Sequence, residues 1–219
     1  MVVAMSESWV KHPAWPYFLP LLCAGVFIAL RDVASVYWLY PLQTVAVAGL
    51  IGWGWKRFPK MRPERLGGSI LVGVAGFVLW VGLDPILVQH PEPRGGFDPW
   101  SVSSGAVAVA LVIIRILGAS LVVPIMEEVF WRGCLMRYLI KEDFESVPLG
   151  SYTHLSFWVT TAAFASVHGA QWVLAVPVGI FYGWWFVRTK TLGDVIVAHG
   201  VTNLLLGGYV VVTGRWYFW

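Results

Sequence analysis

The chain has 219 residues, of which 58% are hydrophobic and 12% are charged. Soluble domains carry about 25% charged residues, so this chain has too few polar side chains to cover a water-facing surface. The net charge of +3 does not indicate a nucleic-acid-binding protein, because five of the fifteen Lys and Arg residues fall in one loop, residues 56–65, between apolar runs. We expect a single integral membrane domain, residues 1–219, in contact with the lipid bilayer and not with nucleic acid.

The first half of the chain contains three apolar runs that predict membrane-spanning helices, at residues 16–30, 33–55 and 66–89. The N-terminus lacks the pattern of a cleavable signal peptide, so the first helix is expected to be retained. Residues 90–100 are rich in Pro and Gly and predict a loop. If the basic loop at 56–65 is cytoplasmic, the N-terminus is cytoplasmic too, because two crossings separate them. These features predict a multi-pass protein of the cell inner membrane.

The second half begins with an apolar stretch, residues 103–140, that is longer than one crossing needs. Pro124 and a charged group interrupt it, which predicts a kinked or broken pair of helices. Three further runs follow, at residues 153–170, 172–187 and 192–213. The whole chain is therefore predicted to be an all-α polytopic transmembrane bundle of seven or eight helices. Arg188 would share the side of the basic loop if the long stretch crosses once, and face the other side if it crosses twice.

Ionisable groups inside the apolar runs are few, and each costs about 2.5–3.5 kcal/mol on insertion scales, so they tend to face one another or a water-filled cavity. The set consists of Arg115, Glu127, Glu128, Arg132, His168 and His199, with Asn203 as a polar companion. Three local patterns organise most of it: Glu127-Glu128-x-x-x-Arg132, Phe164-x-x-x-His168 and His199-x-x-x-Asn203.

Helix geometry suggests what these patterns do. Positions four apart share a helix face, so Glu128 can pair with Arg132. Glu127 is rotated by about 100° from Glu128 and stays available. A free carboxylate in a low-dielectric pocket suits a general base acting on water, and His199 with Asn203 can donate hydrogen bonds to an oxyanion. Any one pair alone is more simply explained by helix packing; the three together favour an active site.

Other polar residues have simpler interpretations. Arg115 is expected to pack or to extend toward the membrane surface, Asp84 before Pro85 to end or bend a helix, and Asp194 to help start the last helix. Cys23 and Cys134 lie in apolar runs and are expected to be buried and free of disulfides. The remaining histidines fall in or near predicted loops and form no constellation: His12, His90 and His154.

The ordered segments PIMEEVFWRG at 124–133, FASVH at 164–168 and HGVTN at 199–203 resemble the three motifs of the CAAX protease and bacteriocin-processing family, EExxxR, FxxxH and HxxxN/B. The resemblance covers a core at about residues 104–210. Within the family, the chain also resembles the branch associated with exosortase protein-sorting systems.

The resemblance implies a glutamate-dependent intramembrane endopeptidase. In this sequence the family's water-activating residues correspond to Glu127 and His168, and its oxyanion-stabilising residues to His199 and Asn203. Glu128, Arg132 and Phe164 take supporting roles. The implied partner is a membrane-associated protein or peptide substrate, with a possible link to an exosortase system, and the implied cofactor requirement is none. The choice of Glu127 over Glu128 as the base rests on the resemblance and not on helix geometry.

Two alternatives remain open. Two histidines and a glutamate can also hold a catalytic zinc ion, although no HExxH pattern occurs and His168 and His199 lie 31 positions apart. A non-enzymatic membrane protein, acting in immunity, assembly or transport, could also contain buried carboxylates and histidines.

Overall fold

The computed structural model describes residues 12–88 and 96–219. Within them the chain forms seven helical rods and no strand, which confirms the predicted all-α bundle. The rods are α2 (Trp15–Ala29), α3 (Val36–Gly54), α4 (Leu66–Leu87), a long rod made of α5 (Gly105–Leu117), α6 (Val123–Phe130) and α7 (Met136–Tyr138), then α8 (His154–Ser166), α9 (Trp172–Thr189) and α10 (Leu192–Thr213).

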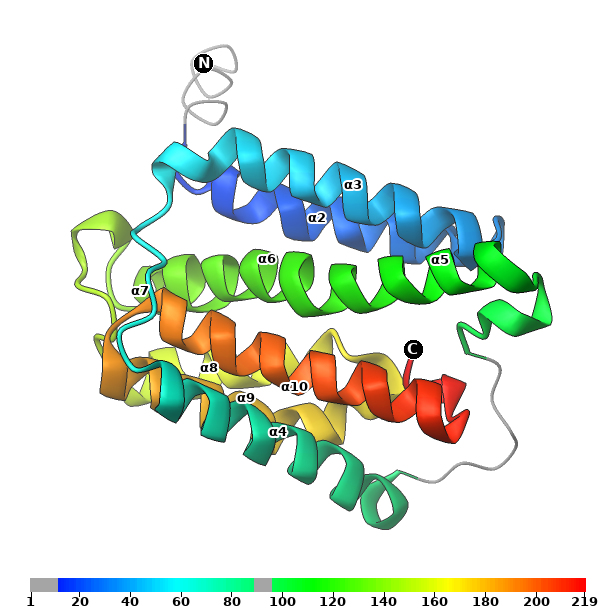
Figure 1. Cartoon of the computed structure of the whole chain (residues 1–219). Helices are drawn as coiled ribbons and strands as arrows, with labels where there is room; N and C mark the ends of the chain where they lie inside the picture. Colours follow the sequence, from blue (N-terminus) through cyan, green and yellow to red (C-terminus); the bar gives the residue numbers. More distant parts are fainter. Residues whose placement is uncertain (1–11, 89–95) are drawn as a thin grey trace.

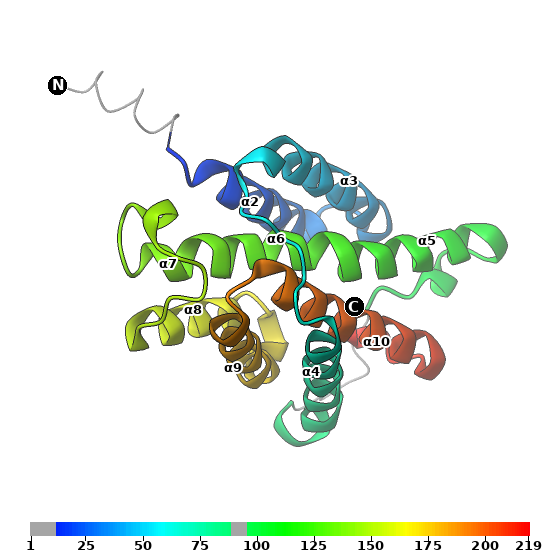
Figure 2. The ribbon, with the colours of Figure 1, turned by 60° about the vertical axis from the view of Figure 1, so that its left-hand side comes forward.

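The long rod runs through the middle of the bundle (Figure 1). The α2–α3 pair covers one side of it, and α4, α8, α9 and α10 lie on the other side, an arrangement that a second view also displays (Figure 2). α10 packs against both the rod and α4. Any cavity between these helices is therefore walled by segments from both halves of the chain.

The predicted break in residues 103–140 is wrong, because Gly105–Tyr138 is one continuous helix. Pro124 is accommodated by a π-helical turn just before it, Gly118–Val122, in which Val123 N donates to Gly118 O. In this wider register the next donor would be residue 124, and proline has no N–H to give. The wider turn accommodates the proline ring, and the helix continues past Pro124 to Tyr138.

Close contact between α4 and α10 depends on glycine. A Cβ on Gly73 would lie 2.5 Å from Ala198 O, a distance that real Cβ atoms do not adopt. The short separation lets Thr202 Oγ1 donate to Gly73 O at 2.8 Å. This contact fixes the rotation of α10 and hence the direction of the His199 and Asn203 side chains.

Asp194 joins the start of α10 to the start of α4. Its carboxylate accepts hydrogen bonds from Arg65 N at 2.8 Å, Ser69 Oγ at 2.9 Å and Thr191 Oγ1 at 2.6 Å. The helix N-cap itself is Thr191, whose hydroxyl accepts from Asp194 N. The sequence predicted only that Asp194 helps to start the last helix. In the structure it also ties that helix to the start of α4.

Asp84 was predicted to end or bend a helix, and it does not end one. α4 continues past it to Leu87, with Pro85 inside the helix. The buried carboxylate accepts a hydrogen bond from Tyr217 Oη at 2.8 Å, which ties the C-terminal segment to α4. Residues 90–95 of the predicted loop at 90–100, including His90, lie outside the described residues.

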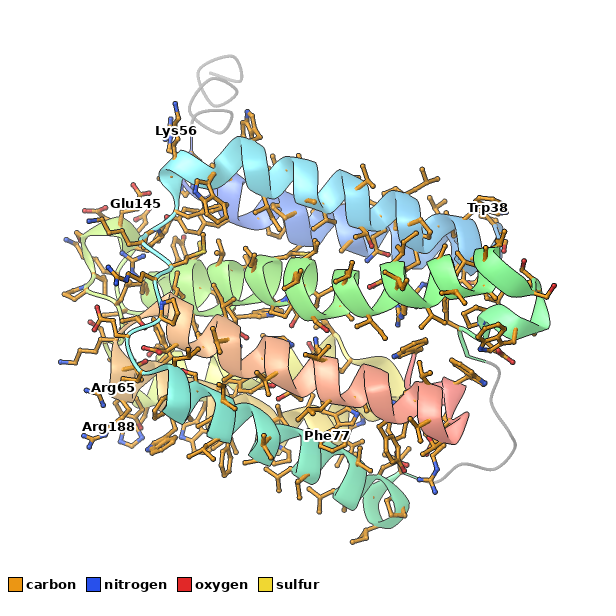
Figure 3. The ribbon with its side chains drawn as sticks, viewed as in Figure 1. Trp38, Lys56, Arg65, Phe77, Glu145 and Arg188 are labelled. Atoms are coloured by element: carbon orange, nitrogen blue, oxygen red, sulfur yellow. The ribbon has the colours of Figure 1, made fainter. Side chains whose placement is uncertain are left out.

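The long rod crosses the bundle once, and the charged residues at its ends can be assigned to sides accordingly. Lys56, Arg65, Glu145 and Arg188 lie at one end of the molecule and Trp38 at the other (Figure 3). Because the rod passes once from end to end, Arg188 shares the end that carries the basic loop. The single-crossing alternative is therefore the one that the fold adopts.

Five helical segments of the described chain are long and apolar enough to span a membrane: Trp15–Asp32, Leu66–Leu87, Gly105–Tyr138, Gly169–Thr189 and Leu192–Thr213. The protein is an integral membrane protein. The predicted span at 33–55 forms α3, a continuous helix that runs beside α2 (Figure 1). It is not one of these five segments, and it contains the polar residues Gln43 and Thr44. α8, at 13 residues, is too short to cross by itself.

Candidate active site

One cavity of about 320 Å³ lies between α2, the long rod and α10, and extends to α4, α8 and α9. Glu127, His168, His199 and Asn203 all line it. The four residues predicted to carry the chemistry, spread over 77 positions of sequence, thus meet at one place. The three motifs come together because α6, the end of α8 and α10 are neighbours in the bundle.

Glu128 is fully buried and bound by two partners. Its Oε1 accepts hydrogen bonds from Arg132 Nη1 at 3.1 Å and from His199 Nδ1 at 2.8 Å. Arg132 also donates to Gly179 O at 3.2 Å. The predicted pairing of Glu128 with Arg132 is present, and the carboxylate additionally holds the histidine of α10.

Glu127 lacks such partners. Its side chain is buried, with 8% of the residue exposed, and its Oε2 has no hydrogen-bond partner among the described residues. An unsatisfied buried polar atom costs about 1–3 kcal/mol, and the residue lines the cavity. Glu127 is therefore the carboxylate of the pair that is free to bind a water molecule or a ligand.

His168 lies just beyond the end of α8, where Gly169 adopts a φ of +56° and turns the chain into α9. Its Nδ1 lies 2.7 Å from Phe164 O. A carbonyl oxygen only accepts hydrogen bonds, so Nδ1 carries the proton and Nε2 of the neutral ring has a free lone pair. The ring packs against Trp80, with centroids 5.6 Å apart.

Phe164 forms the wall between the polar groups. Its ring lies 4.6 Å from the His168 ring and 6.1 Å from the His199 ring, and the Arg132 guanidinium lies 4.8 Å from its centroid. A Cβ on Gly179 would come within 2.9 Å of this ring. The glycine lets α9 approach closely enough for Arg132 to reach its backbone.

The amide of Asn203 donates from Nδ2 to Ala119 O at 2.8 Å. In the π-helical register, residue 124 would donate a hydrogen bond to Ala119 O, but Pro124 has no N–H to donate. One amide hydrogen of Asn203 remains for a ligand in the cavity. His199 and Asn203 thus line the same cavity, as predicted, and each is held by a contact to the long rod that the sequence did not reveal.

Several lining residues were missed or given only a structural role. Trp80 and Tyr182 contact His168 and His199, with centroids 5.6 and 5.0 Å apart. Arg115, expected to pack or extend toward the surface, lines the same cavity. Their sequence context is ordinary apolar helix with aromatic residues throughout, so no local signal distinguishes them.

Other candidates lie away from the cavity. His154 Nδ1 is 3.0 Å from Tyr152 Oη on the exposed surface, and neither it nor His12 lines the cavity. Cys134 is buried and Cys23 half-buried, and both are free thiols, as predicted. In the described part of the chain, no three His, Cys, Asp or Glu side chains gather in a group that could hold a metal ion.

Comparison with known proteins supports the family assignment. Residues 109–205, which fall within the predicted core at 104–210, match the family described as "Type II CAAX prenyl endopeptidase Rce1-like". No curated protein and no solved structure matches the chain significantly. The match spans all three motifs and indicates a membrane protease, a hydrolase. Residues 109–205, which supply the three motifs that line the cavity, are similar to the Rce1-like family of CAAX proteases.

Proposed function

We propose that the protein is a glutamate-dependent intramembrane endopeptidase that hydrolyses a peptide bond of a membrane-associated protein or peptide. The observation that carries the proposal is the contrast between the two adjacent glutamates. Glu128 is held by Arg132 and His199, whereas Glu127 Oε2 has no partner in the described residues and faces the cavity. One carboxylate holds the site together, and the other is available for chemistry.

In this proposal Glu127 and His168 position and activate a water molecule. The His168 Nε2 lone pair accepts one water proton as a hydrogen bond, and the Glu127 carboxylate removes the other as oxygen attacks the carbonyl carbon. A C–O bond forms and the carbonyl becomes an oxyanion. Glu127 then gives the proton to the amide nitrogen as the C–N bond breaks, so the base is regenerated.

His199 and Asn203 would stabilise the oxyanion. Asn203 has one amide hydrogen left after its bond to Ala119 O. His199 donates through Nδ1 to Glu128, so its Nε2 can donate only when the ring carries both protons. Arg132 and Phe164 support this arrangement. Arg132 balances the negative charge of Glu128, and the Phe164 ring lies between His168 and His199.

The orientation in the membrane follows from charge. Lys56, Arg65 and Arg188 share one end of the bundle (Figure 3), and the positive-inside rule assigns that end to the cytoplasm. We propose an inner-membrane protein with a cytoplasmic N-terminus, and a substrate that belongs to a protein-sorting system of the exosortase type.

Cleavage of a membrane-tethered peptide library by the purified protein in lipid vesicles tests the activity. We compare wild type with Glu127→Gln, and use Glu142→Gln, an exposed carboxylate outside the cavity, as the matched control. Each variant is first checked for folding by its thermal transition. We expect wild type and Glu142→Gln to give product and Glu127→Gln to lose at least about 100-fold of the rate.

Two outcomes contradict the proposal. Equal turnover by wild type and Glu127→Gln would mean that another group activates water. No product from folded wild type with any library member would favour a non-enzymatic role in immunity, assembly or transport. In the latter case Glu127→Gln should also leave the cellular phenotype of the protein unchanged.

A further inference from the structure

The cavity extends well beyond the four proposed reacting groups. Arg31, Gln43 and Arg115 also line it, and none of them belongs to the three motifs. Arg31 lies in the 3-10 turn Leu30–Asp32 that follows α2, Gln43 in the middle of α3 and Arg115 in α5. Three separate segments therefore bring two positive charges and an amide into the same space as Glu127.

Arg115 is a cation without a counter-ion. Its guanidinium lies over the Tyr40 ring, 4.1 Å from the centroid, and 5.5 Å from the Phe97 centroid. Its Nε is fully buried and has no hydrogen-bond partner in the described residues. No carboxylate of the described chain forms an ion pair with Arg115 or with Arg31. Three aromatic rings surround the charge, those of Tyr40, Phe97 and Trp219.

Gln43 gives independent support for a ligand at this end. Only 7% of the residue is exposed, yet no described residue hydrogen-bonds to its side-chain amide. The residue lines the cavity, and its amide atoms are not among the fully buried unpaired atoms of the described chain, so they can reach a molecule bound there. An unpaired amide beside two unpaired guanidinium groups points to an anion with several acceptor oxygens, such as a carboxylate, which arginine binds with two parallel hydrogen bonds.

The distance to the proposed reaction site indicates the size of the molecule. Arg115 and Glu127 are twelve positions apart on one continuous helix, which corresponds to roughly 18 Å of rise. Between them Ala119 and Val123 line the cavity, and Leu21 and Ile28 of α2 face them. An extended peptide advances about 3.3 Å per residue, so about five residues reach from one end of this apolar passage to the other.

We propose that Arg31, Gln43 and Arg115 form a subsite for a carboxylate carried by the peptide substrate about five residues from the bond that is cleaved. The proposal rests on the proposed function, because it takes Glu127 as the reacting end of the cavity. The carboxylate is either the C-terminal group of the peptide or an acidic side chain. A peptide is favoured over a lipid phosphate because the cationic groups and Glu127 share one cavity, so one extended molecule reaches both.

A binding experiment tests the subsite separately from hydrolysis. The Glu127→Gln variant, which is expected not to turn over peptide, is placed in phosphatidylcholine nanodiscs. Three dansyl-labelled peptides of the sequence Ala-Leu-Val-Ala-Leu-Val are compared by fluorescence anisotropy: the free acid, the C-terminal amide, and the amide with Glu in place of the last Val. Unlabelled phosphatidylglycerol is then added as a competitor, to test a phosphate headgroup as the ligand.

We expect the free acid, the acidic side-chain peptide or both to bind at least about ten-fold more tightly than the neutral amide. Which of the two binds identifies the source of the carboxylate. Combining Arg115→Gln with Glu127→Gln should reduce the preference for the acidic peptides over the neutral amide to less than about two-fold. Arg31→Gln, at an exposed position in the turn after α2, should reduce this preference without disturbing the packing around Tyr40. Arg188→Gln, an exposed arginine outside the cavity, is the matched control and should keep the full preference.

Equal binding of all three peptides, no saturable binding of any, or a preference that survives both arginine substitutions would overturn the subsite. Displacement of the acid peptides by phosphatidylglycerol but not by phosphatidylcholine would assign the arginines to a lipid headgroup instead. Charge-dependent binding without cleavage by wild type would defeat only the proposed function, and cleavage without charge-dependent binding would defeat only this inference.

Discussion

Nδ1 of His199 lies 2.8 Å from Oε1 of Glu128, although 71 positions separate the two residues in sequence. The same oxygen accepts a hydrogen bond from Arg132. This shared carboxylate joins the first motif to the third. The neighbouring Glu127 lines the cavity, and its Oε2 has no hydrogen-bond partner within residues 12–88 and 96–219. Five predictions follow from this geometry and from the packing around it.

The Glu128–Arg132 pair is predicted to matter for folding as well as for chemistry. Glu128→Gln leaves the buried Arg132 guanidinium without its counter-ion, and breaking a buried pair costs about 3–5 kcal/mol. We expect the unfolding free energy in mixed micelles to fall by about that amount. Glu128→Gln combined with Arg132→Met should lose less than the sum of the single variants, because neither charge is then left alone.

Lys141 and Asp143 provide the matched control for this cycle. Their charged groups lie 3.8 Å apart and are 60% and 67% exposed, so Lys141→Ala should change the unfolding free energy by less than about 1 kcal/mol. Additive effects at Glu128 and Arg132 would contradict the ion pair.

Gly200 is predicted to be irreplaceable by alanine, whereas Gly208 on the same helix is not. A Cβ at residue 200 would lie 2.7 Å from the backbone oxygen of Ser120, while a Cβ at residue 208 meets no atom within 4 Å. Gly200→Ala should push α10 away from the π-helical turn, weaken the Asn203–Ala119 bond and destabilise the protein by about 1–3 kcal/mol. Gly208→Ala should be neutral or slightly stabilising. Thermal unfolding of both variants in the same lipid measures the difference.

His168→Ala is predicted to lower kcat by about 10²–10⁴-fold, because the lone pair at Nε2 that positions water is lost. The melting temperature should fall modestly, because the half-buried ring gives one hydrogen bond to Phe164 and packs against Trp80. His154→Ala, at an exposed histidine outside the cavity, should leave kcat and KM unchanged. A His168→Ala enzyme with a raised KM and normal kcat would assign this residue to substrate binding.

The single crossing of the long rod predicts which loops share a side of the membrane. In a chain with Cys23 and Cys134 replaced by Ala, single cysteines at Lys56 and Arg188 should react with an impermeant maleimide in the same vesicle orientation. A cysteine at Trp100 should react only in the opposite orientation. Reaction of the Lys56 and Arg188 positions from opposite sides would contradict the continuous helix.

Independence from metal is the last prediction. Activity should survive strong chelators, and the purified protein should lack stoichiometric zinc, because the proposed base is Glu127 and Glu128 is already bound to Arg132 and His199. Inactivation by chelators that added zinc reverses would favour the zinc protease alternative.

The sequence by itself determined that this protein lies in a membrane and which ionisable side chains its apolar segments contain. Its hydropathy requires a membrane, since so few charged residues cannot cover a water-facing surface. The Glu128–Arg132 pair follows from the four-residue helical repeat, and the ordered motifs showed the resemblance to the CAAX protease and bacteriocin-processing family. These features depend on composition and on neighbours within one helical turn, so they can be predicted without knowing the fold.

Only the tertiary structure decided how these parts meet. The passage of one helix through Pro124 depends on a π-helical turn, and the contact of Glu128 with His199 depends on α10 approaching the rod at Gly200. Arg115 had no informative neighbours in sequence, yet it lines the same cavity as Glu127. Each of these relationships joins residues on different helices or depends on packing between them, and the periodicity of a single helix contains no information about its partners.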